Sequence, residues 1–201
     1  MSKRQEQAKA TEEKIKQTTM QLLADHNFSD LSVEDITNAS GVAKGTFYRY
    51  FKKKEDIVLA LGLESFYALE SDVTHLSTEN VETKLRYYFV NFMLVIEKSG
   101  IELARQWVKN VVDPAKTSSD FIKWDFDIAS ITRILNEGIS NNRLNSDTPV
   151  DVLARILGTE LYGMVSVWCM TDSKFTPSEW TVKFCDVQLP ALLAPYLVSA
   201  N

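Results

Sequence analysis

Hydrophobic residues recur along this chain at the spacing of helix turns, and no stretch shows the alternation of a strand. A first helix carries Ile15, Leu22 and Leu23, ends near residues 25–27, and follows a polar leader, residues 1–10, that we expect to be frayed. Two short helices follow between about residues 32 and 50. Longer helices are predicted over about residues 54–74, 80–98, 101–112, 118–140 and 148–170, and from about residue 176 onward. The pattern therefore predicts an all-α fold of about nine helices.

Residues 41–51, which read GVAKGTFYRYF, combine an apolar back with a face rich in hydrogen-bond donors. Phe47 and Phe51 are four residues apart, so both can point into a core from one side of a short helix. The opposite side carries Lys44, Thr46, Tyr48 and Arg49. Gly45 keeps that side slim enough for close approach to another surface. A short helix of this kind suits the major groove of DNA.

A partner helix is predicted just before this stretch. Ser32 can cap it, and Asp35 follows three residues later, as in a capping box. Residues 40–41, Ser and Gly, make the turn, which gives helix-turn-helix spacing. On these residues the segment resembles the DNA-binding domain of the TetR/AcrR family of bacterial repressors, and the resemblance covers roughly the first 60 residues.

The resemblance implies an N-terminal helix-turn-helix DNA-binding domain, residues 1–54, and a C-terminal helical effector-binding and dimerisation domain, residues 55–201. It implies a homodimeric repressor that a small-molecule effector releases from a palindromic operator in double-stranded DNA. Following the family motif, the residues expected to contact DNA are Ser32, Lys44, Gly45, Thr46, Tyr48, Arg49 and Lys54. Of these, Lys44, Thr46 and Arg49 are expected at base edges. Ser32, Tyr48 and Lys54 are expected at phosphates, where a contact fixes register without reading sequence.

The charge distribution agrees with a local DNA contact. The 201-residue chain has a net charge of −5, which argues against a uniformly basic nucleic-acid coat. Residues 1–60 contain 10 Lys and Arg against 9 Asp and Glu, whereas the rest of the chain contains 12 against 18. The acidity therefore lies away from the predicted DNA-binding helices.

The last two long helices have clear start signals and more apolar positions than one core needs. Residues 148–151 and 176–179 each give a Thr cap, a Pro at the first helical position and a carboxylate in the first turn. In the family these two helices form a four-helix dimer interface. The residues predicted for it are Leu153, Leu157, Leu161, Met164, Val187 and Leu192. The alternative is that both helices belong to one thick monomer core.

Aromatic residues gather in the effector half, where a cavity between helices would suit an apolar or planar ligand. The candidate effector-binding residues are Tyr88, Phe92, Glu102, Arg105, Trp107, Trp124, Glu160 and Tyr162. The alternative for each aromatic residue is ordinary core, and for each charged residue a solvated helix face or an internal pair. The resemblance supplies no shared pocket motif, so no ligand residue is carried over from it.

No signature of an enzyme is present: the chain lacks a phosphate loop, a nucleophile elbow, an HExxH motif and a CxxC pair. We therefore expect no catalysis, no cofactor and no metal. Cys169 and Cys185 are expected to be free thiols in a reducing cytoplasm. The polar N-terminus and the lack of an apolar run of about 18 residues predict a cytoplasmic protein without a membrane partner. The alternative function is a protein-interaction module with the same fold and vestigial DNA binding.

Overall fold

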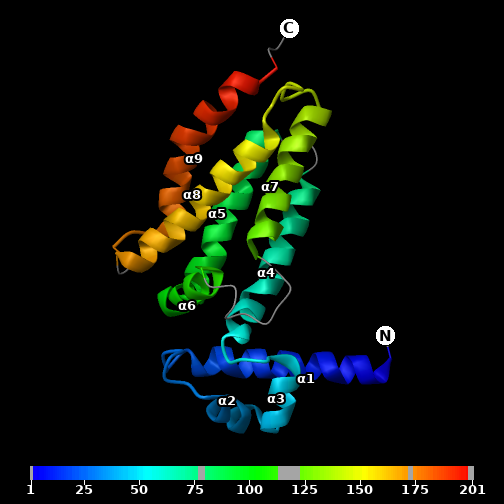
Figure 1. Ribbon diagram of the computed structural model, residues 1–201, viewed down its shortest axis with the longest axis vertical. Helices are drawn as coiled ribbons and strands as arrows, with labels where there is room; N and C mark the ends of the chain where they lie inside the picture. The colour runs from blue at the N-terminus through cyan, green and yellow to red at the C-terminus, as the bar shows by residue number, and fades with distance from the viewer. Residues whose placement is uncertain (1, 77–79, 113–122, 172–173, 199–201) are drawn as a thin grey trace. The chain divides into compact units, whose positions relative to one another are not determined.

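The computed structural model describes residues 2–76, 80–112, 123–171 and 174–198. Helices dominate this part of the chain, and the all-α prediction is confirmed (Figure 1). The helices are α1 (Lys3–Leu22), α2 (Val33–Ser40), α3 (Lys44–Tyr50), α4 (Asp56–His75), α5 (Val81–Ser99), α6 (Ile101–Val112), α7 (Lys123–Ser140), α8 (Val150–Met170), α9 (Pro177–Leu193) and the 3₁₀ helix η2 (Ala194–Tyr196). The predicted start of the seventh helix near residue 118, and the predicted end of the sixth at residues 113–114, lie outside the described residues.

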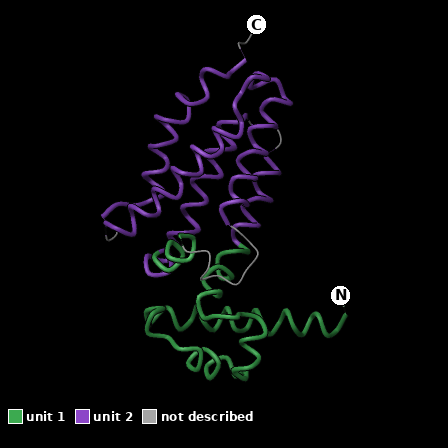
Figure 2. The backbone as a smooth tube through the Cα atoms, in the orientation of Figure 1, with its two compact units in different colours: residues 1–64, 105–120 green, residues 65–104, 121–201 purple. Residues whose placement is uncertain are grey.

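The chain divides into two compact units (Figure 2). Unit 1 comprises Met1–Glu64 and Arg105–Asp120, and unit 2 comprises Ser65–Ala104 and Phe121–Asn201. The division falls inside α4 and inside α6, so each of these helices contributes residues to both units. The functional domains 1–54 and 55–201 remain a prediction.

The expectation of a frayed leader is wrong, because α1 begins at Lys3. Ser2 caps the helix: its hydroxyl accepts a hydrogen bond from the Gln5 backbone N–H at 3.4 Å. The Gln5 side chain returns the bond to the Ser2 backbone N–H at 2.8 Å. This reciprocal capping box satisfies two of the donors that a helix start leaves free, so a polar segment can be helical from its third residue.

Unit 2 is a helical bundle in which α5 packs against α9, and α7 against α8 (Figure 1). Its core includes fully buried side chains from each of these helices, among them Leu85, Phe89, Ile131, Leu157 and Leu189. These positions follow the helical spacing in the sequence, which is why the pattern located the helices well.

The two predicted Thr caps are only partly realised. Pro149, not Thr148, is the N-cap of α8, and the Thr148 hydroxyl instead donates to the Asn145 carbonyl at 2.7 Å. Thr176 is the N-cap of α9 with Pro177 following, as predicted, but its side chain makes no capping hydrogen bond. In both helices a proline near the start supplies the fixed backbone angle without a side-chain cap.

Helix α8 is long and apolar enough to cross a membrane if judged by length and composition alone. It packs against α7 and α9 in unit 2, and 44% of its most apolar window is buried there. Asp151 and Arg155 pair on its exposed side at 3.2 Å. This is the arrangement of a core helix in a helical bundle.

Candidate DNA-binding surface and buried polar cluster

The helix-turn-helix of unit 1 is held by apolar side chains beneath α2 and α3. Ile36 and Phe47 are fully buried, Phe51 is 4% exposed, and the rings of Phe47 and Phe51 lie 5.3 Å apart. The turn between the helices places Gly41 in the left-handed conformation, with φ of 64°, where a side chain would be strained. The apolar back predicted from the sequence is therefore present.

Ser32 and Asp35 form the predicted capping box at the start of α2. The Ser32 hydroxyl accepts from the Asp35 backbone N–H at 3.1 Å, and the Asp35 carboxylate accepts from the Ser32 N–H at 2.8 Å. The same carboxylate also accepts the Ser32 hydroxyl proton at 2.6 Å. Hydrogen bonds from Ser32 lower the pKa of Asp35. In this state the Ser32 side chain is engaged in capping.

The front of α3 is open to solvent, as a DNA-reading face requires. Lys44 and Gly45 are exposed, Tyr48 is 44% exposed and Thr46 is half-buried. A Cβ added to Gly45 would meet no atom within 4 Å, so this part of the helix offers a slim surface. Lys44 forms an ion pair with Glu34 of α2, and the hydrogen bond raises the pKa of Lys44. Because both side chains are exposed, the pair can exchange for a DNA contact at low cost.

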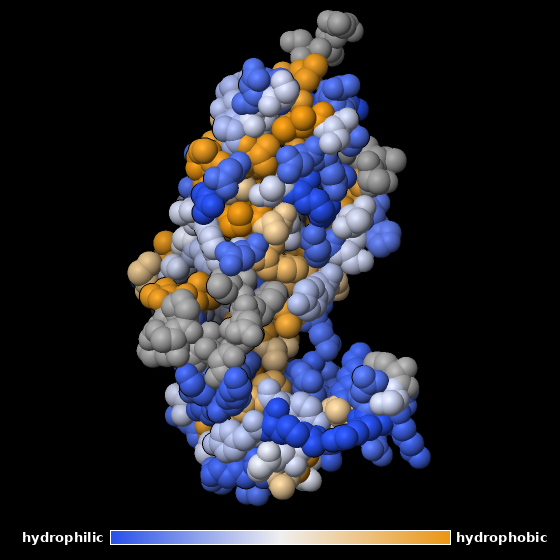
Figure 3. All heavy atoms as spheres, turned by 45° about the vertical axis from the view of Figure 1, so that its right-hand side comes forward, coloured by the Kyte–Doolittle hydropathy of each residue, from blue (hydrophilic) through white to orange (hydrophobic). Residues whose placement is uncertain are grey.

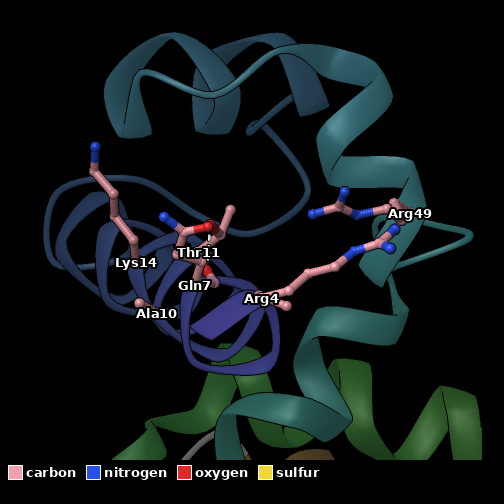
Figure 4. Close-up of a pocket in the computed structure, with 7 residues that line it drawn as sticks. Arg4, Gln7, Ala10, Thr11, Lys14 and Arg49 are labelled. Atoms are coloured by element: carbon pink, nitrogen blue, oxygen red, sulfur yellow. Dashed lines mark hydrogen bonds between the residues drawn. The ribbon is translucent and has the colours of Figure 1, made fainter. Parts of the chain in front are cut away.

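Arg49 points along the surface toward α1. Its Nη2 donates to the Tyr50 hydroxyl at 2.6 Å, and its guanidinium lies 4.8 Å from the centre of the Tyr50 ring. Figure 4 shows Arg4 of α1 and Arg49 of α3 directing their guanidinium groups into the same space. This space is an open groove of about 710 Å³ lined by Arg4, Gln7, Ala8, Ala10, Thr11, Lys14 and Arg49. Three of these lining residues are cationic and none is acidic, so the groove favours an anion.

Lys54 is engaged inside unit 1. Its ammonium donates to the carbonyls of Phe28 at 2.8 Å and Leu31 at 2.7 Å, and it lies 4.5 Å from the Phe28 ring centre. These contacts tie the segment before α4 to the loop before α2. The predicted phosphate contact of Lys54 remains a prediction, and it has these two carbonyls as competitors.

The candidate effector residues divide between the two units. Arg105 and Trp107 belong to unit 1, and Glu160 is exposed on α8. Glu102 is half-buried at the start of α6. In unit 2 the rings of Tyr88, Phe92, Trp124 and Tyr162 form one group, in which Phe92 lies 6.4 Å from Tyr88 and 6.3 Å from Tyr162, and Trp124 lies 5.1 Å from Tyr162.

A buried polar cluster, which we define as Lys123, Asp127, Tyr88 and Tyr162, lies among these rings. Asp127 is 0% exposed, and its two oxygens accept the hydroxyls of Tyr88 at 2.7 Å and Tyr162 at 2.8 Å. Lys123 forms an ion pair with the same carboxylate. Burial and the Asp127 charge raise the pKa of Tyr88 and of Tyr162, so both phenols remain donors.

Lys123 is almost fully enclosed, with 6% of its surface exposed. Its ammonium lies 3.8 Å from the ring centre of Phe66, 4.8 Å from that of Phe92 and 5.3 Å from that of Phe126. Burial lowers the pKa of Lys123 to about 8, although Asp127 opposes the change. The sequence interpretation missed this pair, and the signal available for it was the Lys123–Asp127 spacing of one helix turn.

A second charged network joins α4, α5 and α7 in unit 2. Arg133 donates to Glu70 at 3.0 Å and to Glu137 at 2.6 Å, and Glu137 also pairs with the buried Lys84 at 2.7 Å. The Glu70 Oε2 and Arg133 Nη2 atoms are buried without a hydrogen-bond partner. The network therefore binds three helices together while two of its polar atoms stay unsatisfied.

Most of the side chains predicted for the dimer interface are buried within unit 2. Leu153, Leu157, Leu161 and Met164 are at most 6% exposed inside unit 2, and Leu192 is half-buried. Only Val187, at 67%, is largely exposed. Helical spacing explains the difference: the outward stripe of α8 is offset by one residue from the buried one. The large apolar side chains that α8 and α9 do expose are Val152, Ile156, Val167, Met170, Trp180 and Val187.

Known proteins match this chain in its helix-turn-helix segment and in its helical fold. Residues 15–61 match the family model described as bacterial regulatory proteins, tetR family. The fatty acid metabolism regulator protein of Bacillus subtilis is 24% identical over 162 residues, which span 78% of this chain and 82% of that protein. The transcriptional repressor KstR2 of Mycolicibacterium smegmatis is 24% identical over 156 residues, 72% of this chain and 73% of that one. Thermus thermophilus FadR, solved in complex with lauroyl-CoA, superposes with a TM-score of 0.71 at 20% identity and covers 94% of this chain and 97% of its own.

Proposed function

Because the chain is a TetR-family transcriptional regulator, we propose that it is a homodimeric repressor that a small-molecule effector releases from a palindromic operator. The observation that carries the proposal is the exposure of the donor-rich face of α3, whose opposite side is fixed in the core by the buried Phe47. A helix of 7 residues makes few base contacts, so useful affinity needs two copies on one duplex. Its place of action is the cytoplasm, where the operator is.

The exposed donors of α3 divide into two roles. Lys44 and Thr46 read base edges, with Lys44 exchanging Glu34 for a guanine. Tyr48 holds a phosphate, and Gly45 lets the backbone approach the duplex. Arg49 reaches a base edge only by leaving Tyr50; in its present position it and Arg4 favour the sugar-phosphate backbone. Ser32 and Lys54 add phosphate contacts only if their internal bonds allow it.

Dimerisation is supported by the exposed apolar stripe of α8. Val152, Ile156, Val167 and Met170 follow one side of this helix, and exposed apolar surface is visible over unit 2 in Figure 3. Gly163 lies on the same side, and a Cβ added to it would meet nothing within 4 Å. A second copy can therefore approach α8 closely, with Trp180 and Val187 of α9 completing the surface.

The effector is proposed to bind in unit 2 at the aromatic rings around the buried polar cluster. Tyr88, Phe92, Trp124 and Tyr162 supply apolar surface with a few polar groups, the usual composition of a small-molecule site. The complex of Thermus thermophilus FadR with lauroyl-CoA makes acyl-CoA thioesters a reasonable first class of ligand to test. Binding needs only to favour the DNA-incompetent state by a few kcal/mol.

The proposal is tested by selecting an operator from a random duplex pool with the full-length protein and measuring binding by fluorescence anisotropy. We expect an inverted-repeat operator bound by two protomers. Lys44→Ala should lower the affinity for that operator by about 10-fold or more and relax the preference at one base pair of each half-site. Lys98→Ala, an exposed lysine of unit 2, is the matched control and should bind as wild type. Selection of no sequence would contradict the proposal and favour the protein-interaction module.

A further inference from the structure

The Lys123 ammonium occupies a site of the kind that proteins build for a cationic ligand. The rings of Phe66, Phe92 and Phe126 surround it at 3.8, 4.8 and 5.3 Å, and the Asp127 carboxylate supplies the counter-charge. We call these four residues the aromatic cage. Aromatic faces around an ammonium, closed by one acid, are the usual recognition unit for alkylammonium groups.

The cage is preorganised by residues other than Lys123. Tyr88 of α5 and Tyr162 of α8 hold the two oxygens of Asp127 by hydrogen bonds of 2.7 and 2.8 Å. Phe66 comes from α4 and packs 5.1 Å from Phe92 of α5. Four helices of unit 2 therefore fix the carboxylate and the rings, so the site keeps its shape when the cation in it is exchanged.

Lys123 itself is a poor occupant. It precedes Asp127 by four residues, and this order is less favourable than an acid preceding a base. Its enclosure also carries a desolvation cost, which lowers its pKa. A free ammonium ligand avoids the first of these penalties, because no helix position ties it to Asp127.

We propose that the aromatic cage binds the ammonium group of the effector, which takes the place of the Lys123 side chain. The ligand class is a primary or methylated alkylammonium with an unbranched apolar stem, since it fills the volume that the lysine stem vacates. The exchange replaces one cation by another, so Asp127 is never left unpaired. An anionic head group would instead meet Asp127 and the negative faces of three rings. The inference rests on the proposed function insofar as the ligand is taken to be the effector.

The cage is tested directly by emptying it. In full-length Lys123→Ala, n-propylammonium, whose chain matches the part of the lysine side chain that the substitution removes, should bind at least about 10-fold more tightly than n-propanol and should raise the melting temperature. Adding Asp127→Asn to that variant should abolish the preference while keeping the side-chain shape. Equal binding of the amine and the alcohol in Lys123→Ala would overturn the cage.

The exchange in the wild-type protein is tested by the reactivity of Lys123, which also decides the matter if Lys123→Ala does not fold. Acetylation by an amine-reactive ester, mapped by mass spectrometry, should label exposed Lys98 but not buried Lys123. Saturating n-hexyltrimethylammonium, which cannot itself be acetylated, should speed the labelling of Lys123 by about 10-fold or more, because the displaced side chain leaves a closed site. The neutral 1-hexanol should not change the labelling rate. Continued protection of Lys123 with the quaternary amine would overturn the exchange.

The role of the site in regulation has its own readout. n-Hexyltrimethylammonium should release the selected operator duplex from wild type and should fail to do so from Asp127→Asn. If lauroyl-CoA releases the duplex while the amine neither binds nor exposes Lys123, the ammonium inference fails and the repressor proposal stands. If the amine exposes Lys123 without affecting DNA, the effector role fails. If no operator can be selected, the repressor proposal itself fails, and the labelling experiment still decides the cage.

Discussion

Replacing Asp127 by Asn removes the negative charge beside Lys123 and keeps the shape of the side chain. The amide oxygen can still accept the Tyr88 hydroxyl, and the Tyr162 hydroxyl can rotate to accept from the amide N–H. The energetic loss is therefore concentrated in the pair between residues 123 and 127. Lys123→Met removes the other partner and keeps the unbranched stem among the rings.

The size of the loss is limited because Lys123 can give up its proton. Lowering the pKa of an amine from 10.5 to 7 costs about 5 kcal/mol, and a buried lysine at pH 7 loses no more than that before it becomes neutral. Burial has already brought its pKa to about 8, which accounts for about 3 kcal/mol. Asp127→Asn should therefore cost about 1.4 kcal/mol at pH 7, the equivalent of the one remaining pKa unit.

The double variant isolates the coupling free energy between residues 123 and 127 from the other effects of each substitution. Lys123→Met alone leaves a buried carboxylate with only two phenol donors and should cost about 2 kcal/mol. Lys123→Met with Asp127→Asn leaves no buried charge at the site and should lie within about 1 kcal/mol of wild type. The two single losses would then exceed the double loss by about 2–3 kcal/mol, which is the coupling energy. The measurement is urea unfolding followed by circular dichroism at pH 7, at one protomer concentration because dimerisation contributes to stability. If the loss of the double variant equalled the sum of the two single-variant losses to within about 0.5 kcal/mol, the buried pair would be refuted.

Four further outcomes follow from the structure. Arg4→Ala should weaken binding to all duplexes alike and reduce the salt dependence by about one phosphate contact, measured by anisotropy across a salt series. Val187→Glu should shift the protein from dimer toward monomer in light scattering without loss of helical circular dichroism, since this residue is 67% exposed. Ser32→Ala should lower the free energy of unfolding by about 1 kcal/mol through loss of the α2 cap. Between pH 8 and 10 the free energy of unfolding of wild type should rise relative to that of Lys123→Met. The folded chain releases the Lys123 proton above about pH 8, whereas the unfolded chain keeps it up to about pH 10.5. An identical pH profile for the two proteins would contradict the lowered pKa.

The helix-turn-helix was predictable because its determinants are local. The Ser32–Asp35 capping box, the left-handed Gly41 and the Phe47–Phe51 spacing each act within a few residues, and each is present in the structure. The start of α1 was equally local but was missed. The Ser2–Gln5 signal lies in a segment with almost no apolar residue, and hydrophobic periodicity cannot detect a helix there.

The buried polar cluster and the register of the dimer surface depend on tertiary packing. Nothing in the sequence indicates that Tyr88 of α5 and Tyr162 of α8 both donate to the carboxylate of Asp127 on α7. On α8, apolar residues occupy both sides, so the pattern alone could not separate buried Leu153 from exposed Val152. Such a choice is made by the neighbouring helices, which hydrophobic periodicity does not specify.

The contacts between α7 and α4 indicate which helix a ligand at the cage would affect first. Lys123 at the start of α7 touches Phe66 of α4, and Arg133 farther along α7 bonds to Glu70 of the same helix. Residues 66 and 70 are one helix turn apart, so α7 holds α4 at two consecutive points on one side. The residues of α4 from Ser65 onward belong to unit 2, and those up to Glu64 belong to unit 1 with α3. A ligand that displaces Lys123 would remove the first of these two contacts and leave the second. Within unit 2, α4 is therefore the helix whose contacts a ligand at the cage would change.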